Sequence, residues 1–162
     1  MLLLPCSWEY RTAWSGLDRL AAELPMIRYS ERSHVGAQIE RHLRRIGVAA
    51  ARRIEVDGSD ALAAMVSAGV GWAIGTPLCL LQGAAHAPGI RVVPLPGPRL
   101  GRSLSLICRR GELTAFATRT ASIASHALRD DCVPRLRQLA PWLAHEITLV
   151  QHANPSQELS WS

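Results

Sequence analysis

The 162-residue sequence contains no lysine. All 18 of its basic residues are arginine, and with 13 acidic residues they give a formal net charge of +5. A phosphate-binding loop of the Gly-x-x-x-x-Gly-Lys type needs a lysine, so that class of nucleotide site is excluded. The arginines occur in small separate groups. This pattern is typical of solvated helix faces and strand ends, and it does not indicate a nucleic-acid-binding patch.

Long apolar runs are also missing. No stretch approaches the ~20 consecutive apolar residues that a membrane-spanning helix requires. The opening leucine run is too short for a secretion signal, has no basic residues before it and ends at Pro5. We therefore expect a soluble cytoplasmic protein with no membrane partner.

The sequence also lacks the cysteine and histidine patterns of metal sites and the aromatic pattern of nucleic-acid-binding sites. The six histidines lack the spacing of metal ligands, and aromatic residues make up 5% of the chain, too few for a base-stacking platform. The cysteines form no Cys-x-x-Cys pair, which favours reduced thiols over disulfides or zinc ligation; they are Cys6, Cys79, Cys108 and Cys132. We expect no metal and no cofactor.

Apolar residues make up 48% of the chain and charged residues 19%, which suits one ordinary core and excludes a disordered chain. Apolar periodicity predicts strands at residues 25–29, 53–57, 71–75, 90–95 and 103–108. It predicts helices at residues 33–46, 59–68, 76–81, 112–129 and 134–147. Strands that alternate with helices pair in parallel through right-handed crossovers. The fold class is therefore α/β, with a mostly parallel sheet and helices on both of its faces.

Hydroxyl-bearing residues follow three of the predicted strands, where each strand leads into a helix. Ligands of open parallel sheets bind beyond the carboxyl ends of the strands, where helix N-termini offer unpaired N–H groups. Arginine at such a junction can hold a carboxylate or phosphate with two hydrogen bonds. Serine, threonine and aspartate are also the preferred N-caps, so capping alone is the alternative at each junction. The candidate effector-binding residues are Ser30, Arg32, Ser33, Ser59, Asp60, Thr76 and Pro77.

Catalytic signatures are weak. The glycines at positions 69, 71 and 75 lead into a strand, whereas a dinucleotide-binding loop follows a strand and opens a helix. Ser33 and Cys79 are the nucleophiles that a small α/β enzyme could use. No nucleophile elbow is present, and Cys79 falls in an apolar helical turn, where packing is the simpler role. We assign no catalytic residue.

Several segments together resemble the effector-binding domain of LysR-type transcriptional regulators, a bacterial family. They are PMIRYSERSHVG at 25–36, QIERHLRR at 38–45, AMVSAGVGWAIGTP at 64–77, GIRVVPL at 89–95 and LSLICRR at 104–110. The resemblance covers about residues 1–147, and its specificity comes from the set of segments taken together.

The resemblance implies a periplasmic-binding-protein-like (type 2) fold, with two α/β subdomains, two crossover strands and a small, often anionic effector between them. Family effectors touch strand–helix junctions, which correspond here to Ser30, Ser33, Ser59 and Thr76. Residues 1–17 would hold a crossover strand and hinge of a partial first subdomain, and residues 18–102 would form the complete effector-binding second subdomain. Residues 103–147 would supply the other crossover strand and the C-terminal helices, and residues 148–162 a flexible tail.

Family members begin with a winged helix–turn–helix and a linker helix, and nothing in this sequence corresponds to either one. We therefore expect a chain truncated at its N-terminus, which would contact DNA only through a missing domain. The apolar faces of the predicted helices 112–129 and 134–147 would then be under-covered, which predicts self-association. The resemblance also implies a homo-oligomer that assembles through the regulatory domain.

The leading hypothesis is a transcription factor's regulatory domain, in which a small anionic metabolite biases two arrangements of the subdomains. A free-standing small-molecule-binding module, or a non-functional fragment, is the first alternative. The second is a small Ser or Cys α/β enzyme.

Overall fold

The computed structural model describes residues 1–8, 16–50, 54–98, 100–101, 104–109 and 114–147. These residues form five strands: β1 (Leu2–Pro5), β2 (Ile27–Tyr29), β3 (Ile54–Val56), β4 (Ala73–Ile74) and β5 (Ile90–Val93). In the N-terminal part the helices are α1 (Leu17–Glu23), α2 (His34–Arg45), α3 (Ser59–Ser67), α4 (Pro77–Gln82) and the 3-10 helix η1 (Ala84–Gly89). The predicted alternation of strands and helices up to β5 is confirmed, and with it the α/β class.

The strands are arranged around β1, which lies between β4 and β5 and pairs antiparallel with both. β2 and β3 form a separate parallel pair, and an isolated parallel bridge joins Met26 to Trp72. The prediction of a mostly parallel sheet is therefore not confirmed, because two of the three ladders are antiparallel. The cause is the direction of β1 alone: β2, β3, β4 and β5 run one way, and β1 runs against them.

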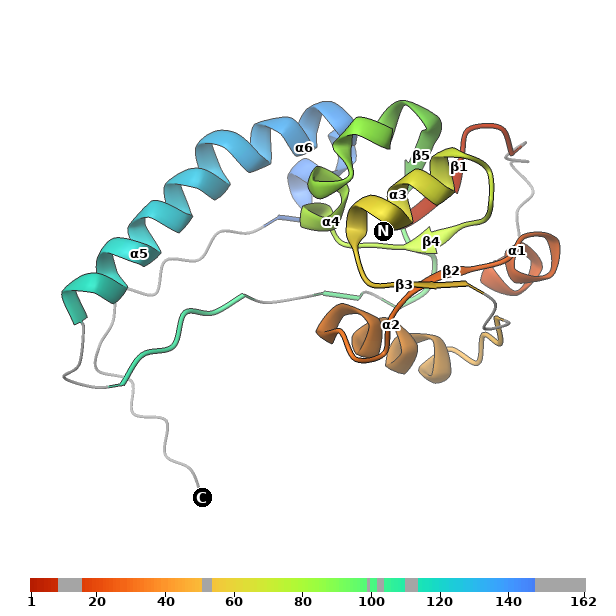
Figure 1. Ribbon diagram of the computed structural model, residues 1–162, viewed down its shortest axis with the longest axis horizontal. Coiled ribbons are helices and arrows are strands. Elements are labelled where there is room, and N and C mark those ends of the chain that lie inside the picture. Colours follow the sequence, from red (N-terminus) through yellow and green to blue (C-terminus); the bar gives the residue numbers. More distant parts are fainter. Residues whose placement is uncertain (9–15, 51–53, 99, 102–103, 110–113, 148–162) are drawn as a thin grey trace, which may run out of the picture.

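The helices cover both faces of the strands, as Figure 1 shows with α3 and α4 above them and α2 below. α3 contacts four strands, β1, β2, β3 and β5, while α2 contacts β2. β1 and β4 are buried on both faces, which is why their sequences read as continuous apolar runs. The largest fully buried side chains of the core include Trp72, Leu2, Leu4, Ile27, Ile74 and Leu80.

Local signals explain why α2 begins and ends where it does. Ser33 caps its start, because the Ser33 hydroxyl accepts a hydrogen bond from the Gly36 N–H at 2.9 Å. At its end Gly47 has a φ of 73°, a left-handed conformation that favours glycine, and the Val48 N–H donates to the Leu43 carbonyl at 3.1 Å. α3 ends in the same way at Gly69.

A close backbone contact fixes α1 and β2 beside β4. The buried Trp72 indole donates from Nε1 to the Leu24 carbonyl at 3.1 Å, and the Trp72 N–H donates to the Pro25 carbonyl at 3.1 Å. A Cβ at Gly71 would overlap the Pro25 carbonyl oxygen. Glycine at this position is therefore what allows the two segments to meet.

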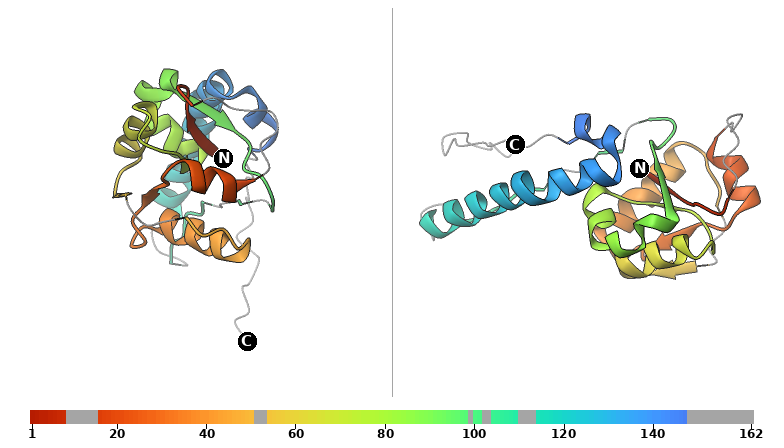
Figure 2. Two further views of the ribbon diagram at one scale, coloured as in Figure 1. Left: turned by 90° about the vertical axis from the view of Figure 1, so that its right-hand side faces the viewer. Right: turned by 90° about the horizontal axis from the view of Figure 1, so that it is seen from above.

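The C-terminal helices form an arm. α5 (Thr114–His126), the π-helical segment η2 (Ala127–Cys132) and α6 (Val133–Leu139) follow one another without a break, and the 3-10 helix η3 (Pro141–His145) comes after α6. Two views show α5 extending away from the rest of the molecule (Figures 1 and 2). The predicted helix at 134–147 is thus wrong in its end, since α6 stops at Leu139 and a 3-10 turn replaces the remainder.

The strand predicted at residues 103–108 is not observed. Ser103 lies outside the described residues, and residues 104–108 form no strand and are exposed, with Ile107 at 88%. Their alternating apolar pattern suits a strand, but strand hydrogen bonds need a neighbouring strand, and within the described chain none lies beside them. The predicted tail at 148–162 also lies outside the described residues. None of the described helices is long and apolar enough to cross a bilayer.

Candidate functional site

At the first predicted junction, the serine hydroxyls form hydrogen bonds within the turn itself. The Ser33 hydroxyl donates to the Ser30 carbonyl at 2.8 Å while it accepts from Gly36, so it is fully used as a cap. Ser30 is buried, and its hydroxyl accepts a hydrogen bond from the Arg32 N–H at 3.4 Å. The Arg32 residue itself is exposed. At this junction Ser33 acts as the helix cap, and the Ser30 hydroxyl forms its hydrogen bond within the turn.

The second junction leaves its hydroxyl available. Gly58 is the N-cap of α3 and makes no side-chain capping bond, so Ser59 occupies the first helical position. The Ser59 hydroxyl accepts a hydrogen bond from the Tyr29 hydroxyl at 3.2 Å. Asp60 points elsewhere: its side chain is 71% exposed and its Oδ1 lies 3.4 Å from Nε2 of His86, on η1.

The third junction combines a cap with a thiol. Thr76 is the N-cap of α4 and Pro77 is its first residue, a position where the missing proline N–H costs nothing. The Thr76 hydroxyl accepts from the Cys79 N–H at 3.4 Å and donates to the Cys79 sulfur at 3.1 Å. Cys79 is 8% exposed.

These contacts bring two of the three junctions together in one polar cluster of Tyr29, Ser59, Thr76 and Cys79. Burial raises the pKa of the Cys79 thiol, but hydrogen bonding within the cluster, first from Ser59 and Thr76, outweighs burial and lowers the pKa overall. Burial raises the pKa of Tyr29, so the phenol keeps its hydrogen and donates it to the Ser59 hydroxyl. The cluster therefore stabilises negative charge on the sulfur.

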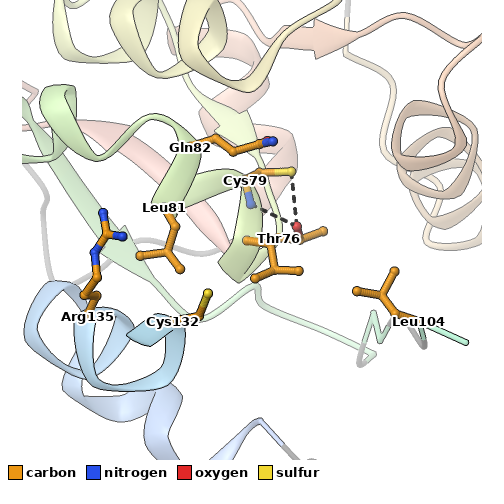
Figure 3. A pocket seen from close by; sticks show the side chains of 8 residues that line it. Thr76, Cys79, Leu81, Gln82, Leu104, Cys132 and Arg135 are labelled. Atoms are coloured by element: carbon orange, nitrogen blue, oxygen red, sulfur yellow. Dashed lines mark hydrogen bonds between the residues drawn. The ribbon is translucent and has the colours of Figure 1, made fainter. Parts of the chain in front are cut away.

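A cavity of about 510 Å³ lies beside this cluster, between α4 and the start of α6 (Figure 3). Its apolar wall is formed by three leucines of α4 and the segment after β5, namely Leu78, Leu81 and Leu104. Its polar wall is formed by Thr76, Cys79, Gln82, Cys132 and Arg135. Figure 3 shows that α4 supplies one side and that Cys132 and Arg135 supply the other.

The Arg135 guanidinium is the cation of this cavity. It pairs with Asp131, one turn earlier, at 3.3 Å, and both side chains are more than half exposed. A guanidinium has five N–H donors, so one carboxylate leaves donors that a ligand can use. An apolar wall that faces one guanidinium and several small polar groups suits a small molecule with an apolar body and an acidic group.

Of the seven predicted site residues, Thr76 alone lines the cavity, and Ser59 reaches it through Cys79. Ser30, Ser33, Arg32 and Asp60 do not line it. The sequence predicts neither Arg135 nor Cys132 as a site residue, because no local motif marks them. It favours packing for Cys79, although the adjacent Thr-Pro cap marks that turn. Among the described residues, no group of three or more His, Cys, Asp or Glu side chains could hold a metal ion.

A polar cluster at strand ends, with a mixed apolar and polar cavity beside it, defines an α/β domain suited to holding a small molecule. The comparison with protein families then identifies it further. Residues 10–127 match the family described as the LysR substrate binding domain, and the chain belongs to that family. The resemblance found in the sequence is thereby confirmed. None of the curated proteins compared with the chain matches it. Membership of this family supports an effector-binding module that regulates transcription and has a periplasmic-binding-protein-like fold.

Proposed function

We propose that this chain senses a small anionic metabolite for a LysR-type transcriptional regulator, and that the cavity between α4 and α6 is where the metabolite binds. The observation that carries the proposal is the position of Thr76, which caps α4 at the end of β4 and lines the cavity opposite Arg135. In this proposal the acidic group of the ligand pairs with the Arg135 guanidinium and lies beside Thr76, whose hydroxyl hydrogen would turn from the Cys79 sulfur to the ligand. Its apolar body packs on the leucines.

Binding of this kind regulates only if the ligand prefers one of two arrangements of the protein. The cavity offers a physical basis, because its walls come from separate elements: α4 belongs to the strand–helix body and Arg135 to the C-terminal arm. A ligand that contacts both walls favours the arrangement that holds them together. The proposed division of the chain into residues 1–17, 18–102 and 103–147 agrees with this mechanism, because it separates the arm from the strands and helices that carry α4. In this proposal the arm is the part that changes position.

The proposal is tested by thermal-shift titration of the chain with a panel of small carboxylates. We expect at least one to raise the melting temperature saturably, with a smaller rise in Ser59→Ala, Thr76→Val and Arg135→Ala. Arg137→Ala is the matched control, since Arg137 is an exposed arginine of α6 that does not line the cavity. Ser30→Ala tests the first junction. Unchanged shifts in the serine, threonine and Arg135 variants would contradict the site.

The alternative functions predict different outcomes. A ligand recovered chemically unchanged argues against the small Ser or Cys enzyme, and the Ser33 hydroxyl is already used by the cap of α2. A free-standing binding module would bind the ligand but show no coupling to transcription. We assign contact with DNA to a separate winged helix–turn–helix domain. We assign assembly into a homo-oligomer to the effector-binding domain of this chain, and we place the protein in the cytoplasm.

A further inference from the structure

One face of α2 forms a second cavity, on the opposite side of the strands from α3. The cavity measures about 280 Å³ and is lined by Gln38, Arg41, His42, Arg45, Leu100 and Gly101. The four α2 residues follow the i, i+3, i+4, i+7 spacing, which places their side chains on one stripe of the helix. Leu100 and Gly101 come from the segment that follows β5.

The charged side chains that line this cavity are all positive. It includes two guanidiniums, those of Arg41 and Arg45, and none of the lining residues is a carboxylate. Like charges four residues apart on a helix repel each other. The nearest acid on α2, Glu40, is buried and receives a hydrogen bond from Arg28 of β2. Glu40 therefore serves the interior and does not line this cavity.

His42 lines the cavity and carries a buried ring donor. The ring is 3% exposed, and the Arg45 guanidinium lies 3.1 Å from its Nδ1. A guanidinium can only donate, so Nδ1 accepts and the ring hydrogen is on Nε2. Nε2 is buried and has no hydrogen-bond partner among the described residues. Burial, and then the charge of Arg45, lowers the pKa of His42, so the ring is neutral at neutral pH.

From these groups we infer that the cavity on α2 binds a compact oxyanion, which is either inorganic phosphate or the carboxylate of a small acid. Guanidinium groups hold oxyanions through paired, charge-assisted hydrogen bonds. An anion between Arg41 and Arg45 removes their mutual repulsion and gives acceptors to a lining that otherwise offers mainly donors. The volume is just below the ~300–1,000 Å³ of sites for drug-sized ligands, which fits a compact anion.

The test is a titration of the 162-residue chain with sodium phosphate or sodium succinate, each against sodium chloride at matched ionic strength. We expect one of the two oxyanions to raise the melting temperature saturably, beyond the chloride control. Arg41→Ala and Arg45→Ala should each weaken the apparent affinity by about tenfold, the effect of ~1.4 kcal/mol. Arg44→Ala removes an exposed arginine of the same helix that does not line the cavity, and it should leave the affinity unchanged.

A second readout follows His42 directly. The ring signals of His42 in a ¹H–¹⁵N spectrum should shift on addition of the oxyanion, while those of the exposed His34 on the same helix should not. Thr76→Val and Arg135→Ala should leave this response intact, which separates it from the cavity beside α4. A rise that matches chloride, or that is reduced equally in Arg44→Ala, shows general screening by salt and overturns the inference.

Discussion

A buried ion pair between β2 and α2 gives the sharpest test of how this fold is held together. Arg28 is 6% exposed and Glu40 is 8% exposed, and the Arg28 guanidinium donates both to the Glu40 carboxylate and to the Ala50 carbonyl. The pair therefore joins strand, helix and the segment after the helix. Glu40→Ala leaves a buried guanidinium whose remaining hydrogen bond is to the Ala50 carbonyl, and Arg28→Met leaves a buried carboxylate that has lost the Arg28 guanidinium.

The expected cost of either single substitution is large. Removing one partner of a buried ion pair typically costs about 3–5 kcal/mol, because the remaining buried charge loses its counter-charge in the pair. The whole free energy of unfolding of a domain is about 5–15 kcal/mol, so one substitution takes a substantial share of it. Replacing both partners by apolar residues removes both charges, and such exchanges are often neutral. The double variant Arg28→Met/Glu40→Leu should therefore be more stable than either single variant.

The assay is urea denaturation followed by far-UV circular dichroism, with the free energy of unfolding extrapolated to water. Four proteins complete a double-mutant cycle: the parent, the two single variants and the double variant. Single substitutions that cost less than about 1 kcal/mol, or a double variant whose cost is the sum of the singles, would refute the reasoning. Either result would mean that water or other groups reach the charges despite their burial.

Three further outcomes follow from the local geometry. Ser33→Ala should lower the free energy of unfolding by about 0.5–2 kcal/mol, the usual cost of losing a serine N-cap, and an unchanged urea midpoint would contradict the cap. In a chain whose other cysteines are serine, Cys79 should react with iodoacetamide with a pH midpoint below the ordinary thiol value. Thr76→Val should move that midpoint upward, since the valine cannot donate to the sulfur. Phe116 and Ile123 are 67% and 60% exposed on α5, so the chain should self-associate in size-exclusion chromatography; serine at both positions should reduce this, and a clean monomer from the parent chain would contradict it.

The parts of the fold that the sequence predicted well are those in which a local signal and the tertiary structure demand the same thing. α2 is the clearest case: a serine cap, an apolar stripe and a glycine stop all lie within one segment of the chain. The strand around Ile74 was predicted for a similar reason, since burial on both faces leaves an apolar run bounded by turn residues. The strand around Ile54 was predicted from its alternating pattern, and in the structure Glu55 is exposed between two half-buried neighbours. The exact ends of these strands were not predicted, because the length of a strand depends on the strand it pairs with.

The C-terminal arm shows where local signals mislead. Pro134 lacks an N–H, and its ring crowds the carbonyl four residues earlier, so the sequence favours a helix that starts afresh there. In the structure the helix continues through Pro134, because the π-helical segment η2 directly before it changes the hydrogen-bond register. Such a register change has no sequence signature that periodicity alone can detect. The cavity beside α4 was missed for a related reason, as Cys79 and Arg135 meet only through packing of distant elements.

The candidate site depends most of all on strand direction. Tyr29 ends β2, Ser59 follows β3 and Thr76 follows β4, and these three strands run the same way. Parallel strands bring their carboxyl ends to one edge, so residues 17 to 47 positions apart in sequence can surround one thiol. Had β4 run against β2, Thr76 and Cys79 would lie at the opposite edge from Tyr29 and Ser59. The sequence could predict hydroxyl groups at this edge, but not which of them would be helix caps. Ser33 caps α2 and Thr76 caps α4, whereas Gly58 takes the N-cap position of α3 and leaves the Ser59 hydroxyl out of the cap.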